Sequence, residues 1–273
     1  MTQKRTVFFI SDRTGITAET LGHSLLTQFD LELEQVTLPF VDDVVRAQKA
    51  VEQINQVATA TGAKPLVFST VVKADVRDHL RQGHATFFDF FDTFISPLER
   101  ELGVPSSHAI GQAHGRGDDR LYDVRIDAMN FALNNDDGVS THHYKDADVV
   151  IVGVSRTGKT PVSIYLALQY GIYAGNYPLT DEDLLDGRLP QCLRKHRRKL
   201  YGLSIHPERL TEIRQERRPN STYASFQQCQ MEVARAEGLF KRESIPYVNS
   251  TSISIEEIAT TIIHEGRLKR RLY

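Results

Sequence analysis

The chain has 273 residues, enough to bury the core of one large or two modest α/β domains. Its 33 basic and 35 acidic residues give a formal net charge of −2, so no global charge favours nucleic acid or a membrane surface as a partner. The only two cysteines, Cys192 and Cys229, lack a partner motif. This argues against a disulfide scaffold or a thiolate zinc site and fits a reducing cytosol.

The N-terminal segment predicts a strand over residues 6–10 and a helix over 16–29. Its apolar run is too short for a signal peptide or a membrane span, so we expect a soluble cytoplasmic protein. Asp12 follows the strand and resembles the carboxylate that supports Mg²⁺ in P-loop enzymes, which makes it a candidate metal ligand and catalytic residue. The turn could also hold a second phosphate. Alternatively, Ser11, Asp12 and Thr14 merely cap the helix.

Alternating strands and helices continue through the first part of the chain. Their order predicts parallel strands with right-handed crossovers, in a Rossmann-like α/β domain. A phenylalanine-rich stretch favours a helix anchored in the core, and a segment with glycines and two histidines favours a mobile loop, which could cover an active site. The predicted ranges are strands 34–40 and 65–70, helices 44–58 and 73–82, the phenylalanine helix 87–94 and the loop 106–119.

A predicted helix over residues 122–133 ends at the turn Asn134–Gly138. An Asp-Asp-Gly turn is ordinary by itself, because these residues tolerate left-handed backbone. Asp136 and Asp137 nevertheless lie close in sequence to the loop described next, so we treat both as candidate general bases. The adjacent His142 and His143 would face opposite ways in an extended segment, which argues against joint metal binding, although one could touch substrate.

A strand, a glycine-rich loop and a helix form the most informative stretch of the sequence. Residues 149–152 are a continuous β-branched run, typical of a strand buried in a parallel sheet. The residues that follow match the Walker A pattern, whose backbone N–H groups surround an anion. Lys159 would neutralise the outer phosphate and the Thr160 hydroxyl would bind Mg²⁺, while Pro161 suits the first turn of the next helix. The predicted nucleotide-binding residues are Gly153, Val154, Ser155, Arg156, Thr157, Gly158, Lys159 and Thr160.

The rest of the chain predicts further strands and helices and one basic segment. Residues 188–218 contain ten Lys or Arg against three Glu. Most of these charges are expected on a solvated face, but the segment could also be a lid or docking surface whose arginines reach a phosphoryl group. The remaining predicted elements are strands at 172–178, 199–205 and 246–250, and helices at 208–217, 221–242 and from the capping box Ser254–Glu257 onward.

We therefore predict an N-terminal α/β domain over residues 1–141 and a P-loop kinase-like domain with a parallel sheet over 142–273. A single continuous sheet is the alternative. The sequence leaves the oligomeric state open and is compatible with a homo-oligomer.

Five motifs in order along the chain carry a resemblance. They are Ser11-Asp-x-Thr-Gly-x-Thr-Ala-Glu19, Asp136-Asp-Gly138, Gly153-Val-Ser-Arg-Thr-Gly-Lys-Thr-Pro161, Gly202-Leu-x-Ile-x-Pro-Glu-Arg-Leu210 and Asn249-Ser-Thr-x-x-Ser-Ile-Glu-Glu-Ile-Ala259. Together they resemble the bacterial phosphoenolpyruvate synthase regulatory protein family, which is related to the plant pyruvate, phosphate dikinase regulatory proteins. The similarity spans nearly the whole chain.

The resemblance implies a bifunctional enzyme. An ADP-dependent kinase would phosphorylate a threonine beside the catalytic histidine of phosphoenolpyruvate synthase and inactivate it. Inorganic phosphate would then attack the phosphothreonine, release pyrophosphate and restore activity. The family's nucleotide-binding loop carries over to Gly153–Thr160.

Chemical reasoning adds roles that the resemblance does not assign. Lys159 and Mg²⁺ would neutralise the phosphates, Arg156 or the basic segment would stabilise the transition state, and Asp12, Asp136 or Asp137 would orient the threonine hydroxyl. Two alternatives share the same loop. One is a small-molecule kinase or NTPase, and the other is a non-catalytic nucleotide sensor that binds a partner.

Overall fold

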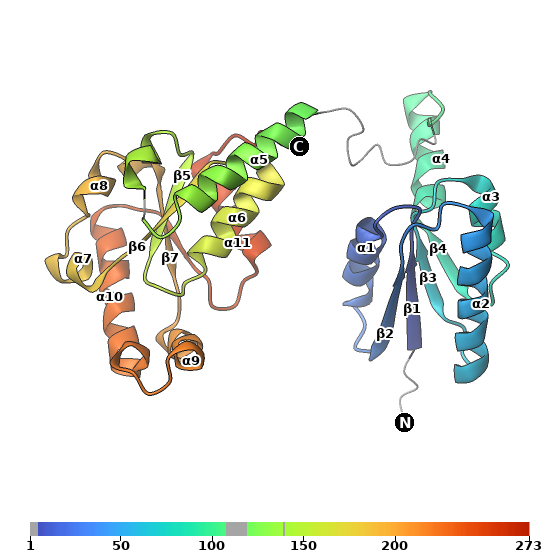
Figure 1. The fold of residues 1–273 in the computed structure, drawn as a ribbon, viewed down its shortest axis with the longest axis horizontal. Coiled ribbons are helices and arrows are strands. Elements are labelled where there is room, and N and C mark those ends of the chain that lie inside the picture. The colour runs from blue at the N-terminus through green and yellow to red at the C-terminus, as the bar shows by residue number, and fades with distance from the viewer. Residues whose placement is uncertain (1–4, 108–118, 139, 273) are drawn as a thin grey trace. The chain divides into compact units, whose positions relative to one another are not determined.

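The computed structural model describes residues 5–107, 119–138 and 140–272, and the chain divides into two compact units, Met1–Gly117 and Asp118–Tyr273. Each unit contains its own parallel four-stranded sheet with helices on both faces (Figure 1). The predicted α/β fold class is confirmed, and the alternative of one continuous sheet is wrong.

The first unit has the strand order β2-β1-β3-β4. Successive residues of the central strand face opposite sides of the sheet, so that Val7 and Phe9 pack with α1 while Phe8 and Ile10 pack with α2 and α3. This sandwich matches the predicted Rossmann-like alternation. Its elements are β1 (Arg5–Ile10), α1 (Ile16–Leu26), β2 (Leu33–Leu38), α2 (Val44–Thr61), β3 (Leu66–Ser69), α3 (Ala74–Leu80), β4 (Thr86–Asp89) and α4 (Phe90–Leu102).

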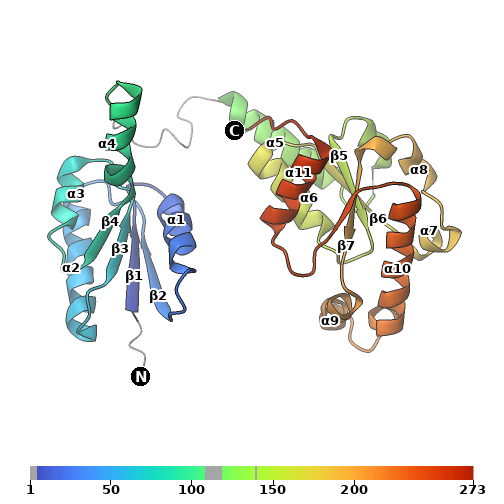
Figure 2. The same ribbon diagram turned by 180° about the vertical axis from the view of Figure 1, so that it is seen from behind.

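The second unit has the strand order β6-β5-β7-β8, with β5 paired to β6 on one side and β7 on the other. Helices α5, α6 and α11 cover one face, and α7 and α10 lie on the other (Figures 1 and 2). The strands are β5 (Val149–Gly153), β6 (Ala174–Pro178), β7 (Leu200–Ser204) and β8 (Tyr247–Asn249). The helices are α5 (Asp119–Asn134), α6 (Lys159–Tyr170), α7 (Asp181–Asp186), α8 (Gln191–Arg194), α9 (Pro207–Arg217), α10 (Phe226–Arg242) and α11 (Ile255–Gly266), with 3₁₀ turns η2 (Thr141–Lys145), η3 (Arg197–Lys199) and η4 (Thr222–Ala224).

The second unit begins at Asp118, earlier than the predicted boundary between residues 141 and 142. Helix α5 belongs to it because the small side chains of Ala128 and Ala132 pack against Ala167 of α6. Phe131 of α5 also stacks on Tyr173, with ring centroids 4.9 Å apart. Sequence spacing predicted this helix correctly but gave no indication of the sheet on which it packs.

Three local predictions need correction. The phenylalanine stretch is not one helix, since Phe87 and Phe88 lie in strand β4 and α4 begins at Phe90. The helix predicted over 221–242 begins at Phe226, after the 3₁₀ turn η4. His142 lies in the 3₁₀ turn η2 and not in an extended segment. Most of the predicted loop at 106–119 lies outside the described residues.

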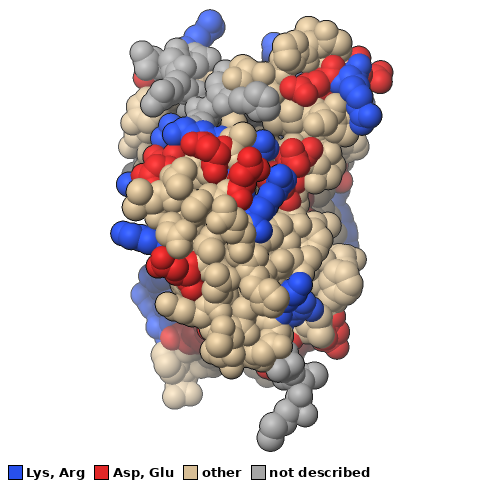
Figure 3. Space-filling model, turned by 90° about the vertical axis from the view of Figure 1, so that its right-hand side faces the viewer, with Lys and Arg blue, Asp and Glu red and all other residues tan. Residues whose placement is uncertain are grey.

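The charge distribution agrees with the near-neutral composition. On the face shown in Figure 3, acidic and basic side chains are intermingled and much of the surface is uncharged. Among the described residues, no helix is both long and apolar enough to cross a bilayer.

Candidate functional site

The glycine-rich stretch forms a loop between the central strand and a helix of the second unit. Strand β5 is buried throughout, and α6 begins at Lys159 directly after Gly158. Gly158 has φ +92°, in the left-handed region that favours glycine. A Cβ atom added to Gly153 would lie 2.4 Å from the Leu203 carbonyl oxygen, so β7 can approach β5 only because residue 153 is glycine. We call Gly153–Thr160 the glycine loop.

Side chains hold several carbonyl groups of the glycine loop. The Val154 carbonyl accepts hydrogen bonds from Thr157 Oγ1 at 3.1 Å and Lys159 Nζ at 3.0 Å. Ser250 Oγ donates to the Thr157 carbonyl at 3.0 Å. In the described part of the chain, the N–H groups of Arg156 and Gly158 donate to no acceptor. The loop therefore presents free amides at the N-terminus of α6, where the helix dipole also favours an anion.

Lys159 places a cation at this helix terminus. The residue is only 5% exposed. Burial lowers the pKa of Lys159 to about 8, and the nearby carboxylates of Asp137 and Asp136 partly oppose that shift. The ammonium group is therefore largely charged at neutral pH, in an environment that water screens poorly.

Asp136 lies directly against the glycine loop, as its position in the sequence suggested. The Thr160 hydroxyl donates to Asp136 Oδ1 at 2.8 Å. The Asn176 side-chain amide donates to the same carboxylate oxygen. The acidic turn, which is close to the glycine loop in the sequence, is thus also close to it in the structure, and Asp136 contacts the loop directly.

Asn176 is a site residue that the sequence did not predict. It is fully buried on β6, and its side-chain oxygen accepts from the Asp137 N–H at 3.0 Å. Its backbone carbonyl accepts from Gly138 N–H at 3.1 Å and from the Tyr144 hydroxyl at 2.8 Å. Asn176 therefore fixes the acidic turn beside the loop, at a point where Asp137 adopts φ +48°.

The oxygens of Thr160 and Asp136 suit a hard cation such as Mg²⁺. Mg²⁺ usually retains water and binds one or two protein oxygens together with substrate phosphates. The described residues contain no group of three or more His, Cys, Asp or Glu side chains arranged to hold a metal. The two oxygens at this position therefore fit a cation that completes its coordination with water or another ligand.

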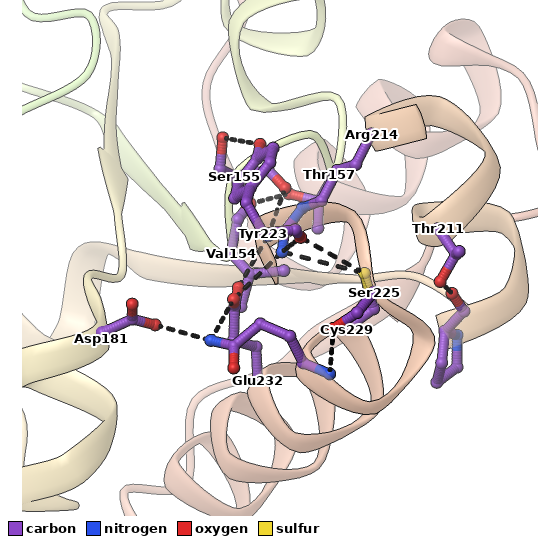
Figure 4. Close-up of polar contacts among 12 residues, drawn as sticks. Val154, Ser155, Thr157, Asp181, Thr211, Arg214, Tyr223, Ser225, Cys229 and Glu232 are labelled. Carbon is purple, nitrogen blue, oxygen red and sulfur yellow. Dashed lines mark hydrogen bonds and ion pairs between the residues drawn. The ribbon is translucent and has the colours of Figure 1, made fainter. Parts of the chain in front are cut away.

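The opposite side of the glycine loop rests on a buried ion pair (Figure 4). Arg214 of α9 is fully buried and pairs with Glu232 of α10 through two contacts, at 3.0 and 2.7 Å. Arg214 Nη2 also donates to the Ser155 carbonyl at 3.1 Å. Its guanidinium lies 4.1 Å from the centre of the Tyr223 ring, and the Tyr223 hydroxyl donates to Ser155 Oγ at 3.1 Å.

The basic segment has mainly structural contacts. Arg197 donates to the Glu243 carbonyl, and Lys199 Nζ donates to the carbonyls of Lys145 and Ala147. Within the described chain, Arg214 is the member of this segment that hydrogen bonds to the glycine loop, and it does so through a carbonyl. Arg156 has φ +78° within the loop, and its proposed role at the transferred phosphoryl group stays a prediction.

Asp12 belongs to the first unit, whereas Thr160 belongs to the second. Its buried carboxylate accepts a hydrogen bond from the Val72 N–H at 2.9 Å. Burial raises the pKa of Asp12, and this hydrogen bond partly offsets the shift. The capping alternative is wrong, because Gly15 is the N-cap of α1 and no side chain caps it. A metal or catalytic role for Asp12 stays a prediction.

Fold and site together define an α/β protein whose second sheet carries a glycine loop, a buried lysine and a carboxylate at a helix N-terminus. The family model described as Kinase/pyrophosphorylase matches residues 7–263. The chain therefore belongs to the kinase/pyrophosphorylase family.

Two similar proteins cover essentially the full length. One from Alkalilimnicola ehrlichii is 64% identical over 270 residues, which span 99% of this chain and 98% of the relative. One from Halorhodospira halophila is 60% identical over 273 residues, the whole of both chains. Both carry the name "Putative phosphoenolpyruvate synthase regulatory protein".

Proposed function

We propose that this protein regulates phosphoenolpyruvate synthase by reversible phosphorylation of a threonine. Family membership supports phosphoryl transfer, and the names of the relatives support this target. The observation that carries the proposal is the glycine loop, with free amides, Lys159 and the Thr160–Asp136 pair around one helix terminus.

In the kinase direction, the donor is ADP and the acceptor is a threonine hydroxyl. The acceptor oxygen forms a bond to the β-phosphorus, the bond between the β-phosphorus and the bridging oxygen breaks, and AMP leaves. The acceptor proton passes to a carboxylate, for which Asp136 and Asp137 are the candidates in this unit. Thr160 and Asp136 would hold Mg²⁺, which neutralises phosphate charge when bound.

In the reverse direction, inorganic phosphate attacks the phosphothreonine. A phosphate oxygen forms a bond to phosphorus, the bond to the threonine oxygen breaks, and pyrophosphate leaves while threonine regains a proton. The loop amides and Lys159 would bind the attacking phosphate in the place that otherwise holds the donor's terminal phosphate. The two reactions thus share one anion site.

Transfer of a label tests this function. The protein is incubated with phosphoenolpyruvate synthase and β-labelled ADP, and unlabelled phosphate is added afterwards. We expect label on a threonine of the synthase and then in pyrophosphate. Label in a metabolite or in free phosphate would favour a small-molecule kinase or NTPase, and ADP binding without transfer would favour a sensor.

The variant Lys159→Ala tests the shared site. We expect both rates to fall by at least about a hundredfold, because the charge stabilises transferring phosphoryl oxygens in each direction. Lys241→Ala removes an exposed lysine from α10 and serves as the control. Full rates in both directions for Lys159→Ala would refute the shared site.

A further inference from the structure

The second unit contains a cavity of about 970 Å³. It is bounded by η2, by α7 and by residues 188–196. Its lining carries exposed charges of both signs, including Lys145, Glu182, Asp186, Arg188 and Lys195. Within the described chain, these five side chains make no ion pair or hydrogen bond, so their charges are available to a ligand.

Tyr177 connects this cavity to the acidic turn. The Tyr177 side chain lines the cavity, and its hydroxyl donates to Asp183 Oδ2 at 3.2 Å. Its ring also lies against Gly138, since a Cβ atom added there would be 3.0 Å from a ring carbon. The cavity and the Asp136–Gly138 turn therefore share one aromatic side chain as a wall.

The acidic turn indicates where the acceptor hydroxyl would lie. In the function proposed above, Asp136 or Asp137 takes the proton of that hydroxyl, so the acceptor has to come within hydrogen-bonding distance of the turn. Asp136 also contacts Thr160 of the glycine loop. Because Tyr177 borders both the turn and the cavity, the cavity adjoins the place where the acceptor would bind.

We propose that this cavity binds the segment of the target protein that flanks the phosphorylated hydroxyl. The inference rests on the function proposed above and adds the place where the protein substrate docks. The volume lies at the upper end of the range for small-molecule sites. The exposed, unpaired charges of both signs around the cavity suit a polypeptide with its own charged side chains.

Charge reversal on the cavity wall provides the test. The variants Lys195→Glu and Arg188→Glu change exposed side chains that line the cavity. Arg198→Glu makes the same change on an exposed residue of the same basic segment that does not line it. For each cavity variant we expect the KM for phosphoenolpyruvate synthase to change by about tenfold. We expect kcat at saturating synthase and the Kd for ADP to stay constant, and Arg198→Glu to resemble the unaltered protein.

Two measurements separate this inference from the proposed function. Binding of the synthase is measured in a surface-based assay without phosphoryl transfer, and transfer is measured with β-labelled ADP. Altered binding in the cavity variants alone supports docking here, even if no label moves. Transfer with an unchanged KM would overturn the docking site and leave the proposed function standing. A lower ADP affinity with an unchanged KM would show that the cavity holds the nucleoside instead.

Discussion

Removing Glu232 should destabilise the second unit strongly, because Arg214 would stay buried without its counterion. Arg214 is fully buried and the side chain of Glu232 is 8% exposed, so neither charge gains much from water. Breaking a buried pair by deleting one partner typically costs about 3–5 kcal/mol. In Glu232→Ala, the carbonyls of Ser155 and Tyr223 and the Tyr223 ring still solvate the guanidinium. We therefore expect the lower end, about 3 kcal/mol.

Urea unfolding followed by circular dichroism measures this loss by linear extrapolation. The relevant transition is that of the second unit, which contains Glu232 and the glycine loop. If the loop binds ADP as proposed, ADP identifies this transition by shifting it to higher urea. In thermal unfolding, 3 kcal/mol corresponds to about 6–12 °C for a unit of this size. Glu212→Ala is the control, since Glu212 pairs with Arg209 at 2.8 Å while both side chains are at least half exposed. Exposed pairs contribute about 0–1 kcal/mol.

A double variant separates stability from loop geometry. Arg214→Met with Glu232→Leu removes both charges, and apolar replacement of a buried pair is often neutral or stabilising. We expect near-normal stability but weaker ADP binding, because the Ser155 carbonyl loses its donor. A loss below about 1 kcal/mol in Glu232→Ala would refute the argument that this pair is a buried, unscreened interaction.

Two further predictions concern the glycine loop. Burial lowers the pKa of Lys159 to about 8 in the folded protein, below its unfolded value of 10.5, so ADP affinity should fall as the pH rises above 8. The cost of burying the charged lysine should also decline between pH 8 and 10.5, so the contribution of this group to the free energy of unfolding should rise there. Calorimetry of ADP binding and urea unfolding over pH 7–10 measure the two effects, and a flat affinity would contradict a role for the ammonium. Gly153→Ala should lower stability by about 1–3 kcal/mol, because its Cβ atom would meet the Leu203 carbonyl on β7. Thermal unfolding beside Gly238→Ala, where the added atom would meet only the flexible end of the Arg242 side chain, tests this. Equal melting temperatures for the two variants would show that the contact with β7 is unimportant.

The glycine loop was predictable because its determinants are local. A β-branched run, two glycines and a helix start follow one another within a few turns of chain, and each constrains its immediate neighbours. Asn176 and Arg214 were not predictable in this way. Asn176 binds a carboxylate 40 residues away, and Arg214 binds a carbonyl 59 residues away. Such contacts depend on which strands pair and which helices pack, and one sequence does not specify these.

The errors in the first unit have the same origin. Ser11, Asp12 and Thr14 have side chains that suit a helix cap, but the Asp12 carboxylate binds the N–H of Val72, 60 residues further on. In the run around Phe88, Asp89, Asp92 and Thr93 recur at helical spacing, which fits the helix that begins at Phe90 but does not indicate that Phe87 and Phe88 precede it in a strand. Pairing with β3 decides in favour of a strand, and the rings of Phe88 and Phe68 stack with centroids 5.0 Å apart.

The contacts around the glycine loop explain why the loop can hold an anion at all. A free peptide segment exposes carbonyl oxygens as readily as N–H groups, and carbonyl oxygens repel phosphate. Here protein donors engage the carbonyls of Val154, Ser155 and Thr157. The N–H groups of Arg156 and Gly158 are among the backbone groups that remain for a ligand within the described chain. Arg214 and Ser250 therefore contribute to anion binding without touching the anion, by fixing which way the backbone faces.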